Sequence, residues 1–96
     1  MLYLILMNPD ENKNSLYKGA ITILGGKPWY VTSLARPTIF KTQREVKNMV
    51  VKLMKWNPDR EFIEVTVEFY LSLVGKSLDK WSNSWINQLR QEQLEL

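Results

Sequence analysis

The stretch from Glu61 to Val74 alternates between apolar and other side chains, and this regularity constrains the fold more than any other feature of the sequence. A period of two residues predicts a β-strand. One face of that strand would carry Ile63, Val65, Val67, Phe69, Leu71 and Leu73, and the other Glu64, Thr66, Glu68 and Tyr70. Because the second face is mostly polar, we predict an antiparallel or mixed sheet that is covered on one side only.

Three further strands are predicted nearer the start of the sequence. Leu2–Met7 is a continuous apolar run, which fits a strand that is central or buried on both faces. The segments Leu16–Leu24 and Trp29–Ser33 predict two more strands, and Gly25–Pro28 supplies the turn between them. These two strands are expected to form a hairpin.

A helix is predicted from Gln43 to Trp56. Its apolar residues recur at helical spacing, so they form one stripe that should face the core: Val46, Met49, Val50, Leu53 and Met54. Thr42 and Glu45 fit a capping box at the start, in which the threonine hydroxyl accepts from the Glu45 amide and the carboxylate returns to the Thr42 amide. Pro58 ends the helix, because it disfavours helical dihedral angles at Asn57.

A second helix is predicted to begin at Ser77, with Asp79 in its first turn. Its apolar stripe would contain Leu78, Trp81, Trp85, Ile86 and Leu89. The predicted order is therefore β-β-β-α-β-α. Both stripes must be buried, so we predict one α+β domain over residues 1–96, a two-layer sandwich with a roughly four-stranded, mostly antiparallel sheet and both helices on one face.

The composition excludes several kinds of chemistry. The 96 residues include no Cys and no His, which removes disulfides, thiol nucleophiles, the usual zinc sites and the commonest general base. We therefore expect no enzyme, no catalytic residue, no metal and no cofactor. The apolar start, residues 1–7, is too short to span a bilayer and lacks a basic leading segment. We accordingly expect a cytoplasmic protein without a membrane partner.

Three short patterns resemble functional motifs without meeting their requirements. Glu64 and Glu68 would lie roughly 13 Å apart along a strand, too far for a glycosidase pair. Pro58-Asp59 followed by Glu64 resembles a nuclease pattern, but Thr66 stands where that pattern has lysine. Gly25–Lys27 lacks the spacing and the following helix of a phosphate-binding loop. A solvated strand face and simple turns are the better interpretations.

The charge is distributed unevenly. Up to Lys55 there are nine cations and three acids, whereas from Trp56 onward there are four cations and seven acids. Such asymmetry points to a polar partner. Six cations lie on or just before the first predicted helix: Arg36, Lys41, Arg44, Lys47, Lys52 and Lys55. They either follow the phosphates of a nucleic acid or form a solvated helix face, and the sequence leaves both interpretations open.

The last predicted helix offers another candidate surface. Trp81, Trp85 and Leu89 either pack in the core or form an interface with a protein partner or a second copy of the chain, since Trp is common among binding anchors. A strand edge is a further surface through which a homodimer could form.

From residue 29 to residue 69 the chain resembles small uncharacterised phage and prophage proteins. The matching pieces are Tyr30–Thr32, Phe40–Thr42, Glu45-Val46 and Ile63–Val67. The resemblance implies an accessory protein that acts by binding a host or phage protein, including an inhibitor of a defence or nucleic-acid-handling protein, and it brings no catalytic residues. We therefore expect a non-enzymatic binding protein, with nucleic-acid binding by the first helix as the alternative.

Overall fold

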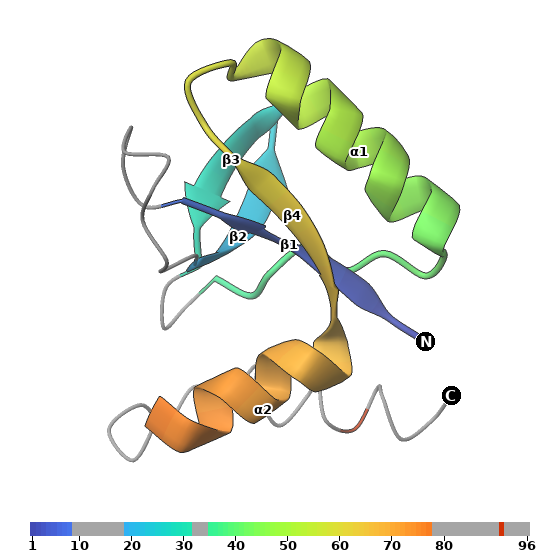
Figure 1. The fold of residues 1–96 in the computed structure, drawn as a ribbon, viewed down its shortest axis with the longest axis vertical. Coiled ribbons are helices and arrows are strands. Elements are labelled where there is room, and N and C mark those ends of the chain that lie inside the picture. Colours follow the sequence, from blue (N-terminus) through green and yellow to red (C-terminus); the bar gives the residue numbers. More distant parts are fainter. Residues whose placement is uncertain (9–18, 32–34, 78–90, 92–96) are drawn as a thin grey trace.

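The computed structural model describes residues 1–8, 19–31, 35–77 and 91, and within them it has an antiparallel sheet of four strands and two helices (Figure 1). The strands lie in the order β3-β2-β1-β4. The elements are β1 (Tyr3–Met7), β2 (Gly19–Leu24), β3 (Lys27–Tyr30), α1 (Gln43–Trp56), β4 (Phe62–Thr66) and α2 (Val67–Ser77). The predicted α+β class is confirmed.

The hairpin between β2 and β3 turns through two glycines. Gly25 and Gly26 have φ angles of 58° and 77°, the left-handed region that suits glycine in a two-residue hairpin. The turn is therefore shorter than predicted, because Pro28 belongs to β3 and pairs with Ile23. β3 is an outer strand of the sheet, where a proline costs no hydrogen bond to a neighbouring strand.

β1 is central, and both of its faces are buried. Its residues alternate between two apolar clusters: Leu4 and Leu6 belong to one, and Ile5 and Met7 to the other. The continuous apolar run in the sequence reflects this double burial.

The two helices consequently lie on opposite faces of the sheet. Val46 and Leu53 of α1 pack with Ile5 and Met7, whereas Val67 at the start of α2 packs with Leu4 and Leu6. Figure 1 shows α1 and α2 separated by the strands. This arrangement corrects the expectation of both helices on one face and of a sheet with a solvated side.

α2 begins where the predicted long strand was expected to continue. The strand ends at Thr66, whose hydroxyl accepts a hydrogen bond of 3.1 Å from the Phe69 amide and so caps the helix. Val67, Tyr70 and Leu71 then contact the first apolar cluster at helical spacing. Ser77, the predicted cap of a later helix, is the last residue of α2, and the stripe from Leu78 to Leu89 lies outside the described residues.

The helical conformation of residues 67–77 gives a testable contrast. In a strand, Phe69 and Leu71 would share one face, but in α2 Leu71 packs against the core and Phe69 is exposed. Leu71→Ala is expected to lower the free energy of unfolding by about 1–3 kcal/mol, and Phe69→Ala by less than about 1 kcal/mol. Urea unfolding followed by circular dichroism measures both, and equal losses would contradict the helical assignment.

The segment from Arg36 to Phe40 joins the sheet between β1 and β2. Tyr3 and Phe40 exchange two backbone hydrogen bonds of 2.8 and 2.9 Å, and the Thr38 amide donates to the carbonyl of Ile21 at 3.1 Å. The Thr38 hydroxyl accepts from the Ile23 amide at 2.8 Å. Because β1 pairs directly with β2 only through Leu6 and Met7, this segment supplies partners where the two strands separate.

α1 begins and ends at the predicted residues. The Thr42 hydroxyl accepts from the Glu45 amide at 3.2 Å, which confirms this half of the predicted capping box. At the other end, the Asn57 backbone and side-chain amides both donate to the Leu53 carbonyl, at 2.8 and 3.1 Å. The helix is thus fixed at both ends by its own sequence.

Candidate functional site

The outer face of α1 carries most of the cations that the sequence singled out. Arg44, Lys47, Lys52 and Lys55 are all exposed on α1, and we call these four residues the basic helix face. Lys41 is exposed immediately before the helix. The only acid in α1 is Glu45, so the positive charge along this helix is largely unopposed within the helix itself.

Arg36 and Lys47 are less available than the other cations. Arg36 is half-buried, and its carbonyl accepts a hydrogen bond from the Thr22 hydroxyl. The Lys47 ammonium lies 3.9 Å from a carboxylate oxygen of Glu64, on the edge strand β4. This surface ion pair contributes little to stability, but it offsets part of the charge of Lys47.

The basic helix face also exposes apolar side chains. Met54, predicted to be in the core, is 50% exposed, and Val51 beside it is 66% exposed. The buried stripe of α1 is correspondingly narrower than predicted, and among its five predicted members only Val46 and Leu53 are fully buried. The outer surface is therefore a mixture of lysine, arginine and aliphatic groups.

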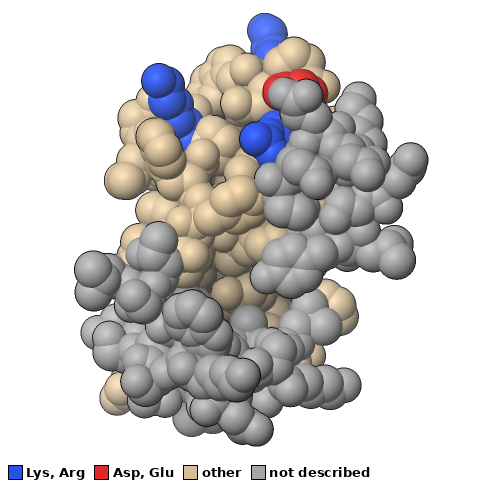
Figure 2. All heavy atoms as spheres, turned by 90° about the vertical axis from the view of Figure 1, so that its left-hand side faces the viewer, with Lys and Arg blue, Asp and Glu red and all other residues tan. Residues whose placement is uncertain are grey.

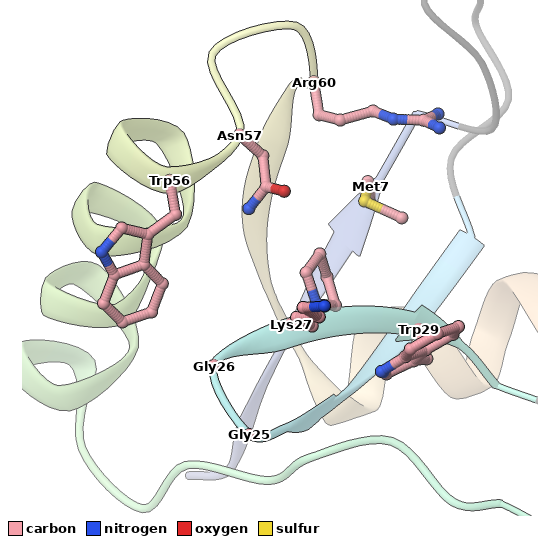
Figure 3. A pocket seen from close by; sticks show the side chains of 9 residues that line it. Met7, Gly25, Gly26, Lys27, Trp29, Trp56, Asn57 and Arg60 are labelled. Atoms are coloured by element: carbon pink, nitrogen blue, oxygen red, sulfur yellow. The ribbon is translucent and has the colours of Figure 1, made fainter.

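A groove lies between the C-terminal end of α1 and the β2–β3 hairpin, and we call it the hairpin groove. Its volume is about 710 Å³, and it opens to solvent. It is lined by Met7, Gly25, Gly26, Lys27, Pro28, Trp29, Trp56, Asn57 and Arg60 (Figure 3). None of these lining residues is acidic, and two are exposed tryptophans.

Trp56 and Trp29 approach the groove from different elements. Figure 3 shows the Trp56 ring on the α1 side of the hairpin and Trp29 on the other side of the turn, along β3. The two residues are 53% and 57% exposed, so much of each indole meets solvent. A Cβ atom placed on Gly26 would lie 3.7 Å from the Trp56 ring, which means that the ring rests against the hairpin turn.

Arg60 is held in place by the end of β1. One of its guanidinium nitrogens donates to the carbonyl of Asn8 at 3.3 Å, and the Tyr30 hydroxyl donates to the same carbonyl. A guanidinium has five N–H donors, so this contact leaves others to meet a ligand. Figure 3 shows Arg60 and Lys27 on different sides of the groove, on the loop after α1 and on β3.

Asn8 connects the end of β1 to the loop before β4 through hydrogen bonds to Glu61. It is buried, and its side-chain amide donates to a carboxylate oxygen of Glu61, while its backbone amide donates to the Glu61 carbonyl at 3.2 Å. Within the described residues, the Asn8 side-chain oxygen has no hydrogen-bond partner. The amide–carboxylate pair therefore anchors the loop that carries Arg60 to the end of β1.

The surface on the hairpin side of the molecule shows separate positive groups. In Figure 2, Lys and Arg side chains stand apart from one another over the upper part of this face, with uncharged surface between them. An acidic group lies close by, next to the atoms that are not described. This spacing suits several separate contacts to a chain of anions better than one tight anion site.

Sequence reasoning found the basic helix face but missed the hairpin groove. The sequence predicts only a strand at Trp29 and a helix end at Trp56, and Arg60 is not among the predicted site residues. The glycine pair fixes the register of the hairpin, which places Trp29 on the face opposite Tyr30, but it does not predict that Trp56 lies against the turn.

Some candidates stay untested. Trp81, Trp85 and Leu89 lie outside the described residues, so their role as an interface remains a prediction.

Within the described part of the chain, no group of three or more Asp and Glu side chains could hold a metal ion. Neither α1 nor α2 has the length and apolar character needed to cross a bilayer.

Comparison with known proteins assigns the chain to no family. No family model, no curated protein and no solved structure matches it.

Proposed function

We propose that the chain is a non-enzymatic nucleic-acid-binding module, whose basic helix face contacts backbone phosphates. The observation that carries this proposal is the set of exposed cations along α1, accompanied in that helix by the single acid Glu45. Phosphates bound by lysine and arginine release condensed counterions, and this release supplies most sequence-independent affinity for nucleic acids.

The geometry of α1 favours an extended partner. A helix of 14 residues is about 21 Å long, so its cations can meet several successive phosphates of one strand. Val51 and Met54, exposed between the cations, offer apolar contact to sugars or bases. A binding mode of this kind needs no enclosed pocket and no catalytic group.

The salt dependence of binding tests this proposal. The double variant Lys52→Gln with Lys55→Gln is expected to reduce the slope of log affinity against log salt concentration by about 1.4 for a single strand, since each phosphate contact contributes about 0.7. Fluorescence anisotropy of a labelled oligonucleotide, measured over a range of salt concentrations, provides the slope.

A matched control separates local contacts from net charge. Phe69→Glu with Ser72→Glu changes the net charge by the same two units, but both positions are exposed on α2, on the other face of the sheet. Glu at position 69 also completes a capping box with Thr66, so this control should fold. Equal slopes for the two double variants, or no binding by the unmodified protein at low salt, would overturn the proposal.

The expectation of a protein partner stays a prediction. It rests on the uneven charge distribution, on the resemblance to phage accessory proteins, and on Trp81, Trp85 and Leu89, which lie outside the described residues. Nucleic-acid binding is preferred because Arg44, Lys52 and Lys55 are exposed along one helix that contains a single acid.

A further inference from the structure

We infer that the hairpin groove binds the unstacked bases of a single-stranded nucleic acid, with Trp56 as the stacking surface and Lys27 and Arg60 as phosphate contacts. This inference rests on the proposed function and names its substrate class. It adds a second contact region, distinct from the basic helix face, that contacts the bases as well as the phosphates.

Trp56 offers an exposed aromatic face at the edge of the groove. An indole that is about half exposed leaves a large apolar surface in water, and Trp56 belongs to neither apolar cluster of the core. Trp56 rests against the Gly26 turn, so little side-chain entropy is lost when a base stacks on its free face. Stacking on a protein aromatic accepts every base, because each base has a π-face.

The charged residues that line the groove are all positive. Lys27 and Arg60 line it from β3 and from the loop after α1, and no acid is among the lining residues. The nearby acids do not cancel these cations: Glu61 already accepts from the Asn8 amide, and Asp59 is exposed in the turn before Arg60 without lining the groove. The groove therefore complements a polyanion that also presents flat apolar groups.

The position of the groove favours binding of a nucleic-acid strand over binding of an isolated nucleotide. Trp56 lies four residues after Lys52 of the basic helix face, a spacing that makes the two side chains neighbours on the helix surface, so a nucleic-acid strand that crosses the groove can continue along α1. Base faces are covered by neighbouring bases in a duplex and become accessible in a single strand. An open groove beside a row of cations thus fits a single strand better than a duplex.

The test compares variants and probes in one set of titrations. The probes are an oligothymidylate of about 15 nucleotides, a duplex of equal length and thymidine monophosphate. Trp56→Ala is expected to weaken binding of the oligothymidylate about 5- to 150-fold, the usual effect of losing one stacked base, whereas Trp29→Ala, on the opposite face of the hairpin, should have a smaller effect. Trp56→Phe, which keeps an aromatic face, should recover part of the loss.

The control for these variants is Leu24→Ala. Leu24 is an exposed apolar residue at the end of β2 in the same hairpin, but it does not line the groove, so its replacement should leave affinity unchanged. The tryptophan variants should keep the salt slope within about 0.7 of the unmodified protein, because no phosphate contact is removed. Circular dichroism confirms that each variant is folded.

The outcomes separate this inference from the proposed function. Tighter binding of the oligothymidylate than of the duplex, lost in Trp56→Ala, supports the inference. Equal affinity for both probes, unaffected by Trp56→Ala but dependent on Lys52 and Lys55, overturns the groove and leaves the proposed function standing. Binding of thymidine monophosphate as tight as that of the oligothymidylate also overturns the inference, and no binding of any probe overturns both.

Discussion

Leu53→Ala is expected to lower the free energy of unfolding by about 2–5 kcal/mol, a large part of the stability of a small domain. Leu53 is fully buried and belongs to the cluster that joins α1 to the sheet, together with Ile5 and Phe62. Truncation to alanine removes the buried methyl groups and leaves a cavity in a closely packed region.

The neighbouring residue provides the control for this prediction. Met54→Ala removes a side chain of similar size that is 50% exposed, so we expect a loss of less than about 1 kcal/mol. Chemical unfolding monitored by circular dichroism measures both variants. Comparable losses would mean that α1 is rotated relative to the sheet from the orientation described.

Asn8→Asp is expected to lower the free energy of unfolding at neutral pH by about 2–4 kcal/mol. The substitution replaces the amide that donates to Glu61 with a carboxylate, so two acids meet at a buried position. Burial and the like charge should raise the pKa of the introduced carboxyl above its usual value of about 4. The native state of the variant then binds more protons than the unfolded state, and its stability relative to the unmodified protein falls as pH rises through that pKa.

A second substitution tests the cause of this loss. Glu61→Gln in the Asn8→Asp background restores one amide and one carboxylate with their positions exchanged, and should recover much of the stability at neutral pH. Thermal unfolding from pH 4 to pH 8 measures the single and double variants. No recovery in the double variant, or a deficit independent of pH, would show that the Asn8–Glu61 pair is not the source.

Local sequence signals predicted α1 and the hairpin well. Thr42 with Glu45 marks the beginning of α1 and Asn57-Pro58 its end, and both ends agree with the structure because capping and proline effects act within a few residues. Gly25 and Gly26 similarly determine a turn by their own backbone freedom. Such local signals act in the same way regardless of the tertiary contacts of the rest of the chain.

The same reasoning failed between Val67 and Leu73 because two periodicities overlap there. Val67 and Leu71 share a strand face in a period of two, and they also share a helix face at a spacing of four. Tyr70 breaks the strand alternation but completes the helical stripe, and it packs against the core cluster with Leu71. The cap at Thr66 was the local signal that should have decided between the two conformations.

Helices cover both faces of the sheet, and the sequence of β1 indicates this. The polar side of β4 had wrongly predicted a sheet with one solvated face. An apolar run in β1 that alternates between two clusters requires a layer on each side of the sheet. The hairpin groove was harder to predict, since it forms where residues 30 positions apart, Gly26 and Trp56, come together. Tertiary contacts of that kind have no local sequence signal.

The central position of β1 determines how late in synthesis the sheet can be completed. β1 is the first strand in the sequence, yet its partner β4, through the pair Leu4 and Val65, is translated about 60 residues later. At roughly 5–20 residues per second, an apolar strand waits several seconds on the ribosome before its partner emerges. The β2–β3 hairpin can form at once, so the early intermediate is expected to expose β1, and the nascent chain to need protection there until α2 has left the exit tunnel.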